Sequence, residues 1–131
     1  MTCPGSATTT VEAEAAGNTF AGQAASTPCA ACSGGAKVRF IGNGTANSVT
    51  IPVTATAAGN RQLTIQYTVD GTRSFFVSVN GGTATEVALS GTSWATPVTG
   101  TATVTLAAGS NTLRFFNDLG WAPDLDVIAI G

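Results

Sequence analysis

Five of the seven acidic side chains of this chain lie close to its two ends. Glu12 and Glu14 stand near the start of the sequence, and Asp118, Asp124 and Asp126 stand near its end. Charged residues make up only 9% of the sequence, whereas they form roughly 25% of an ordinary soluble domain. Carboxylates that cluster at both ends of such a chain predict that the ends meet in space and share a cation. Because the ligands would be oxygens, we expect a hard ion, with calcium as the first candidate.

Two of the three cysteines form a Cys-Ala-Ala-Cys segment, Cys29 to Cys32, within a stretch rich in Gly, Ser and Ala. A zinc site would need a second such pair or histidines, and the sequence contains no His. A redox-active pair normally opens a helix beside a βαβ unit, which this sequence does not show. We therefore expect a structural disulfide between Cys29 and Cys32 in a secreted protein, with Cys3 as an unpaired thiol.

The overall composition excludes several classes of partner. The chain has 131 residues and a formal net charge of −2, and its five basic residues are too scattered to form a stripe that would bind nucleic acid or an anionic membrane. No apolar run approaches the ~18 residues of a membrane span, and the first residues do not resemble a signal peptide. We expect a monomeric module excised from a longer protein, with residues 1–8 as a linker or cloning remnant and residues 9–131 as the domain.

Apolar residues alternate with polar ones in several stretches, which is typical of half-buried strands. Turn signals recur every eight to twelve residues, and no sustained helical period is present. This pattern predicts an all-β protein, an antiparallel β-sandwich of the jelly-roll kind with about nine strands. The expected strands cover residues 11–15, 37–41, 49–53, 63–69, 75–79, 85–89, 102–106, 113–115 and 125–130.

The connections between these strands divide into two groups. Tight glycine turns at residues 57–60, 80–82 and 107–110 fall at one end of an antiparallel sandwich, and loops 42–47, 70–72, 90–97 and 117–124 fall at the other. The second end gathers aromatic, amide, carboxylate and guanidinium groups, which are the groups that bind a sugar ring and its hydroxyls. These residues are Asn43, Asp70, Arg73, Trp94, Asn117, Asp118, Trp121 and Asp124. We interpret this end as a sugar-binding site.

Several motifs, taken in order, resemble family 35 carbohydrate-binding modules over residues 11–131. They are the Glu-x-Glu segment at residues 11–15, the Cys-x-x-Cys-Ser-Gly-Gly loop at 29–35, Ile-Gly-Asn-Gly at 41–44, Asn-Gly-Gly at 80–82, the segment 106–113 and Trp-Ala-Pro-Asp-Leu-Asp at 121–126. The resemblance implies a β-sandwich attached to a secreted glycoside hydrolase or polysaccharide lyase.

The resemblance also implies a structural calcium held by Glu12, Glu14 and Asp126, with backbone carbonyls near Ser33 completing the coordination. Glu12 and Glu14 would project to the same side of one strand, as two ligands of one ion must. The alternative is that both are solvated carboxylates on an edge strand. Asp126, however, lies in an apolar strand and would need a partner there.

For the sugar site, the resemblance assigns ligand contacts to Trp121 and Asp124 in the last loop, with Asn117, Asp70 and Arg73 beside them. Relatives often carry Tyr in place of Trp121 and Arg in place of Val127. Alternatively, Asp124 and Asn117 cap a turn. Trp94 could be a ligand platform or a lid over the core. The pattern is most similar to modules attached to galactose-releasing enzymes, which implies terminal galactose as the ligand.

We therefore expect a non-catalytic, calcium-containing module that targets a parent glycoside hydrolase to the terminal galactose-type sugars of a polysaccharide. The alternatives are a module that binds uronic acids through a second calcium in the ligand site, and a structural or adhesive sandwich without a ligand. Catalysis would depend on carboxylates such as Asp118 and Asp124 as a glycosidase pair. Such a pair needs a deep cleft, which a sandwich of this size with short loops rarely supplies.

Overall fold

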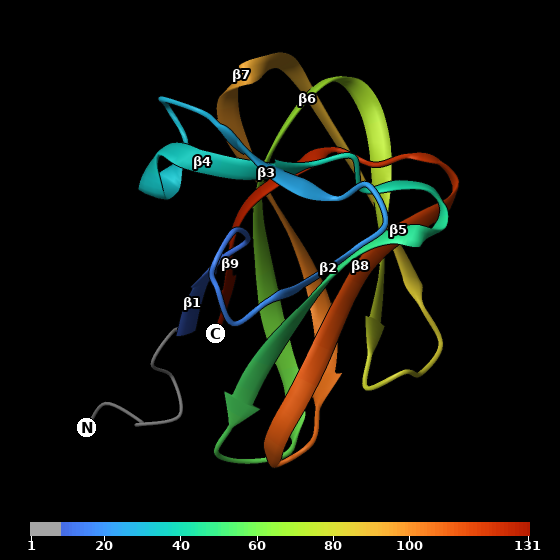
Figure 1. The fold of residues 1–131 in the computed structure, drawn as a ribbon. Helices are drawn as coiled ribbons and strands as arrows, with labels where there is room; N and C mark the ends of the chain where they lie inside the picture. Colours follow the sequence, from blue (N-terminus) through green and yellow to red (C-terminus); the bar gives the residue numbers. More distant parts are fainter. Residues whose placement is uncertain (1–8) are drawn as a thin grey trace.

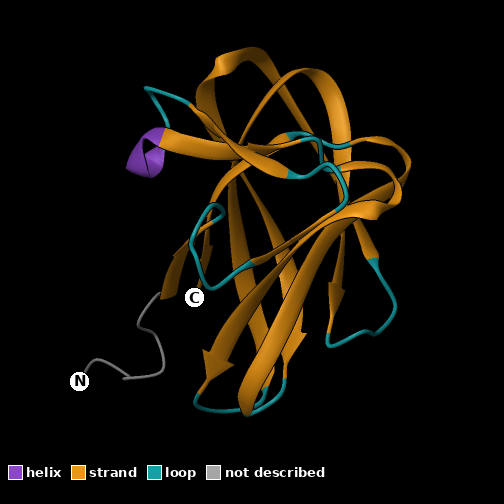
Figure 2. Cartoon of the chain, in the orientation of Figure 1, coloured by secondary structure: helices purple, strands orange, loops and turns teal. Residues whose placement is uncertain are grey.

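The computed structural model describes residues 9–131, which form nine strands and one short 3-10 turn (Figures 1 and 2). The prediction that residues 1–8 are a linker lies outside the described residues. The strands are β1 (Thr9–Glu12), β2 (Thr19–Ala21), β3 (Ala25–Pro28), β4 (Ala36–Arg39), β5 (Gly42–Ala55), β6 (Gly59–Val79), β7 (Thr85–Leu106), β8 (Gly109–Trp121) and β9 (Asp124–Ile130), and the 3-10 turn is Ser33–Gly35. The predicted all-β antiparallel sandwich is thereby confirmed.

Two long strands, β6 and β7, pair as one hairpin and pass through both layers of the sandwich (Figure 1). The first half of β6 pairs with β9, and its last residues pair with β8. One layer therefore contains β2, β5 and β8, and the other contains β9, β4 and β3, with β1 added along β9. The two layers share the bent hairpin, which closes the sandwich along one side.

The sequence analysis divided each of these long strands into two, and that division was wrong. Residues 70–72 resemble a turn, but they pair with the equally turn-like residues 90–92 of β7, with Gly71 opposite Gly91. Because each turn-like segment finds its hydrogen-bond partner in the other, the hairpin bends without ending. The short strands β2 and β3 were not predicted, since their alternating pattern is only three or four residues long.

The core lies between the layers and is built from the alternating apolar residues of the long strands. Phe75 of β6 and Phe115 of β8 are fully buried, and their rings meet edge to face with centroids 5.5 Å apart. Full burial of such a side chain contributes about 1.5–3 kcal/mol, so the core stabilises a rigid frame for the connections at either end. None of the described residues forms a helix long and apolar enough to cross a membrane.

The connections differ between the two ends of the sandwich. The β5–β6 and β7–β8 turns lie together at the lower end in Figure 1, whereas the bends of β6 and β7 lie at the upper end. The upper end also carries β3, β4 and the loop in which Cys29 and Cys32 form a disulfide with Cα atoms 5.3 Å apart. Three of the predicted sugar-binding residues, Arg73, Trp121 and Asp124, lie in or beside these upper connections.

Candidate functional site

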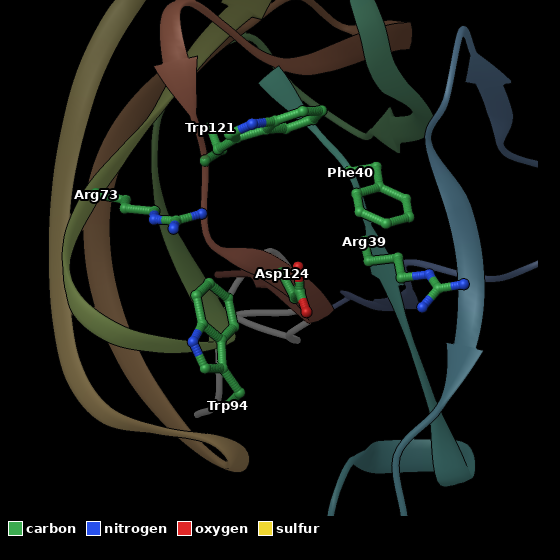
Figure 3. Close-up of a pocket in the computed structure, with 7 residues that line it drawn as sticks. Arg39, Phe40, Arg73, Trp94, Trp121 and Asp124 are labelled. Carbon is green, nitrogen blue, oxygen red and sulfur yellow. The ribbon is translucent and has the colours of Figure 1, made fainter. Parts of the chain in front are cut away.

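A cavity of about 330 Å³ opens among the connections at the upper end of the sandwich. Figure 3 shows aromatic and charged side chains facing it from several directions. We call it the apex pocket, and its walls come from the ends of β4 and β8, the start of β9 and the middle of β6 and β7. The residues that line it are Arg39, Phe40, Arg73, Trp94, Trp121, Ala122 and Asp124.

Phe40 contributes one aromatic wall because the backbone turns sharply at that residue. Its φ is +62°, a left-handed conformation that is unusual for a bulky side chain and often marks a functional position. The alternation of the sequence would place Phe40 on the buried face with Val38, but the turn leaves it 46% exposed. Its ring centroid lies 5.8 Å from that of Trp121, so the two rings form one apolar surface.

Trp121 is placed by a close approach of two backbones. Gly42 pairs with Trp121, and a Cβ at Gly42 would lie 2.5 Å from the carbonyl oxygen of Gly120. Buried Asn117 shapes the same turn, since its side-chain oxygen accepts hydrogen bonds from the backbone N–H groups of Leu119 and Gly120 at 2.8 and 3.1 Å. The residues that hold Trp121 in place therefore do not need to touch the ligand themselves.

Asp124 is the acidic side chain of the pocket, and it is paired with a lysine. Its Oδ2 lies 3.0 Å from the Nζ of Lys37, which also donates hydrogen bonds to Thr68 Oγ1 at 2.9 Å and to the carbonyl oxygen of Trp94 at 2.6 Å. Burial raises the pKa of Asp124 above its usual value, while the hydrogen bond and charge of Lys37 act in the opposite direction. Lys37 thus ties β4, β6, β7 and β9 together beneath the pocket.

The two arginines of the pocket stack on its aromatic rings. The Arg73 Cζ lies 4.8 Å from the ring centroid of Trp94, and the Arg39 Cζ lies 4.7 Å from that of Phe40. Stacked in this way, a guanidinium keeps its N–H groups in a fixed plane for binding paired oxygens. Aromatic faces beside a carboxylate and planar donors are the chemistry that the sequence analysis expected of a sugar site.

The structure brings three of the five predicted ligand residues, Arg73, Trp121 and Asp124, around one pocket. Asn117 lies behind the pocket within its supporting turn, and Asp70 is exposed opposite Thr92 in the bent hairpin, outside the pocket lining.

Sequence reasoning did not select Arg39, Phe40 or Lys37 as site residues. A large aromatic residue directly before the Ile-Gly-Asn-Gly turn was a usable signal for Phe40. The burial of Lys37 depends on long-range packing, and no local pattern indicates it.

A second group of polar residues lies where the two ends of the chain meet. Strand β1 pairs with β9, and the backbone N–H of Ala13 donates to the carbonyl oxygen of Asp126 at 2.9 Å. This pairing brings together carboxylate oxygens of Glu12, Glu14 and Asp126, all within 4.8 Å of one another. We call these three residues the carboxylate cluster, and Asp118 is not part of it.

The hydrogen-bond partners of the carboxylate cluster are neutral. Fully buried Asp126 accepts from the backbone N–H of Ser33 at 3.0 Å and from Gln66 Nε2 at 2.6 Å. One carboxylate oxygen on each acid of the cluster, Glu12 Oε1, Glu14 Oε1 and Asp126 Oδ1, is buried without any hydrogen bond. Buried oxygens without donors are costly, so their convergence is the feature of this structure that a cation would explain.

Electrostatics and backbone shape agree with a cation at this position. Burial raises the pKa of Glu14, and the neighbouring charges of Glu12 and Asp126 raise it further. Gly34, with φ +67°, lies so close that a Cβ there would be 3.0 Å from Glu14 Oε2. The donor set consists of carboxylate oxygens, which suits calcium. The structure thus brings together the three carboxylates of the ligand set implied by the resemblance, and the hydroxyl of Ser33 donates to Glu12 beside them.

Comparison with protein families identifies a match over almost the whole described chain. The family described as carbohydrate binding module, family 35, matches residues 9–130. A family 35 carbohydrate-binding module from Clostridium thermocellum is 34% identical, with a TM-score of 0.91, and the match covers 94% of this chain and 98% of that one. A search among proteins with curated descriptions found no match.

Two further similar structures are enzymes much longer than this chain. An exo-β-1,3-galactanase from Phanerochaete chrysosporium, in complex with β-1,3-galactotriose, is 25% identical with a TM-score of 0.84, and the match covers 94% of this chain and 29% of the enzyme. A GH26-CBM35 β-(1,4)-mannanase from Podospora anserina is also 25% identical, with a TM-score of 0.72, and the match covers 94% and 27%. The chain therefore spans less than a third of either enzyme.

Proposed function

Because the chain belongs to family 35 of the carbohydrate-binding modules, we propose that its apex pocket binds the terminal galactose-type sugar of a polysaccharide and that the chain itself is not catalytic. The observation that carries this proposal is the convergence of Trp121, Phe40 and Asp124 on one open cavity. The aromatic pair offers a surface for the C–H face of a pyranose, and the carboxylate accepts hydrogen bonds from its hydroxyls.

The choice of a galactose-type sugar is supported by the motif in which Trp121 and Asp124 lie, and by the similarity to part of a β-1,3-galactanase. Open pockets of this kind form few hydrogen bonds, each with a net contribution of about 0.5–1.5 kcal/mol, so we expect a Kd in the micromolar to millimolar range. A parent glycoside hydrolase in cis would gain by being held close to its polymer. Such an enzyme would be secreted, as the disulfide also suggests.

A non-catalytic role is supported by the count of acids at the pocket. Asp124 is the one carboxylate among the residues that line the described cavity, whereas glycoside hydrolysis ordinarily requires two across the scissile bond. Asp124 is moreover paired with Lys37, which favours its charged form as a hydrogen-bond acceptor. We therefore expect no turnover of aryl glycosides or polysaccharides by this chain.

We propose calcium as the ion of the carboxylate cluster, bound by Glu12, Glu14 and Asp126. Its contribution there is to neutralise three converging carboxylates and to fix β1 against β9. The cluster involves none of the residues that line the apex pocket. Sugar binding should therefore depend on this ion only through the stability of the fold.

A uronic acid is the second candidate ligand, because three of the five basic residues, Lys37, Arg39 and Arg73, lie at or beside the apex pocket. In the alternative from the sequence analysis, a second calcium would bind the carboxylate of the sugar. The ammonium group of Lys37 already balances Asp124, which weakens the attraction of a metal ion to this pocket. The arginines could instead bind a carboxylate directly.

Titration calorimetry with galactose, glucuronic acid and mannose tests the proposal. We expect galactose to bind, and we expect Trp121→Ala and Asp124→Asn each to weaken that binding at least tenfold, or about 1.4 kcal/mol. Phe20→Ala is a matched control, since Phe20 is an exposed aromatic residue outside the pocket. Binding that survives both pocket variants would place the site elsewhere, and tighter binding of glucuronic acid would favour the second candidate.

A further inference from the structure

A second cavity of about 410 Å³ lies beside the apex pocket, and the two share Trp94 as a wall. The opposite wall of the second cavity is the segment Pro28 to Ala31, and Ala95, Thr96 and Lys37 complete its lining. Lys37 connects the two cavities as well, because its Nζ binds Asp124 of the apex pocket. The function proposed above uses only the apex pocket and leaves the second cavity without a role.

The shared wall is a structured bulge in β7. Tyr67 pairs with Val98 and Val69 pairs with Ser93, so the four residues 94–97 lie opposite a single residue of β6. The hydroxyl of Ser93 accepts hydrogen bonds from the backbone N–H groups of Ala95 and Thr96 at 2.9 and 3.2 Å. Bulges re-aim side chains next to functional sites, and this one holds Trp94, which is 37% exposed, between the cavities.

The opposite wall is the loop closed by the disulfide of Cys29 and Cys32. Within it, the backbone N–H of Cys32 donates to the carbonyl of Cys29 at 3.1 Å, and the N–H of Cys29 donates to Gly35 at 3.0 Å. Ala30 and Ala31 are exposed at its tip. The Cys-Ala-Ala-Cys motif therefore makes a fixed, uncharged wall of small side chains facing a tryptophan.

The chemistry of this second cavity fits a neutral sugar residue. Its lining contains no carboxylate, and the ammonium group of its lysine already donates to Thr68, Trp94 and Asp124. Trp94 and the alanines offer apolar contact, while the exposed hydroxyl of Thr96 offers a hydrogen-bond partner. This lining offers no free opposite charge to a charged ligand. It does offer an apolar surface on which the C–H face of a pyranose can pack.

We propose that this second cavity binds the penultimate residue of the same glycan whose terminal sugar occupies the apex pocket. The inference builds on the proposed function, since it requires a terminal sugar in the apex pocket, next to the shared wall formed by Trp94. It gives the disulfide loop a direct role in ligand binding. The module would then bind a single terminal residue through the apex pocket and a disaccharide unit more tightly through both cavities.

Titration calorimetry with galactose and with β-1,3-, β-1,4- and β-1,6-linked galactobiose tests this inference. For the wild-type protein we expect at least one galactobiose to bind about tenfold more tightly than galactose. This ratio corresponds to a difference of ~1.4 kcal/mol in binding free energy. Ala31→Leu places a larger side chain in the second cavity, so it should remove that advantage while galactose affinity stays within about twofold. Ala84→Leu is the matched control at a distant surface cavity and should change neither affinity.

The results separate this inference from the function on which it builds. Equal affinity of the wild-type protein for galactose and every galactobiose, or an Ala31→Leu variant that retains the advantage, would overturn the second subsite alone. Loss of both affinities in Ala31→Leu with an unchanged melting temperature would also overturn it, because the two cavities would then not act separately. Failure of all four sugars to bind the wild-type protein would overturn the proposed function and this inference together.

Discussion

Asp124 and Asp126 lie two residues apart on β9, yet they are neutralised in different ways. The side chain of Asp124 is 16% exposed and pairs with Lys37. Asp126 is fully buried and meets two further carboxylates, with only neutral donors around the group. The apex pocket therefore contains its own countercharge, whereas the carboxylate cluster needs one from outside. This difference is the basis for our two proposals, that the first acid contributes to sugar binding and that the second binds a cation.

Removal of metal should have the largest effect. If calcium neutralises the carboxylate cluster, an ion at one hundred times its Kd stabilises the fold by about 2.7 kcal/mol. For a domain of this size, this free energy corresponds to ~10 °C in melting temperature. Scanning calorimetry of chelator-treated protein, with and without added calcium, measures the shift. If the melting temperature is the same with and without calcium, the carboxylate cluster binds no ion that stabilises the fold.

The second prediction removes the internal countercharge from the apex pocket. Lys37→Met leaves the carboxylate of Asp124 without its partner, and we expect a loss of about 2 kcal/mol in the free energy of unfolding. The double variant Lys37→Met/Asp124→Leu should recover part of this loss, because the uncompensated charge is then gone. Denaturant titration of both variants checks this, with Arg61→Met as a control, since Arg61 is a half-buried basic residue of β6 outside the apex pocket. Additive losses would show that the pair is not coupled.

Removing one charge from the carboxylate cluster should stabilise the protein without metal and destabilise it with calcium. In chelator, Glu14→Gln relieves repulsion from Glu12 and Asp126, so the variant should be more stable than the wild-type protein by about 1 kcal/mol. With calcium present, the variant lacks one charged ligand and should be the less stable protein. Thermal melts in the two buffers give the comparison. The same order of stability in both buffers would argue against a shared ion.

The smallest effect is expected at Asp70, which the sequence analysis placed among the ligand contacts. Asp70 is exposed outside the apex pocket lining, so Asp70→Ala should change sugar affinity by less than about twofold, a difference well under 1.4 kcal/mol. Calorimetry alongside Asp124→Asn supplies the contrast between an exposed acid and a pocket acid. A tenfold loss in Asp70→Ala would extend the binding surface along the bent hairpin.

Local pattern was enough to predict the fold class and part of the site. Alternation in segments such as Leu63–Val69 specifies half-buried strands whatever the rest of the chain does, and the glycine turns specify where several of them end. The last loop carries Trp121 and Asp124 within four residues, so their nearness follows from the sequence. The sequence analysis also placed Glu12 and Glu14 on one side of a single strand, which was wrong, because β1 ends at Glu12 and Glu14 lies in the turn that follows.

Only the tertiary structure decided the features that depend on distant pairing. The bend of β6 continues through a turn-like segment because its partner strand offers matching hydrogen bonds, as at Gly71 and Gly91. Lys37 and Asp124 form a salt bridge although they lie 87 positions apart in the sequence. Phe40 points away from the core because its backbone turns there. The residue types determined which groups could bind a sugar or a cation. Long-range packing determined which of them meet, because burial and countercharge depend on neighbours that are remote in the chain.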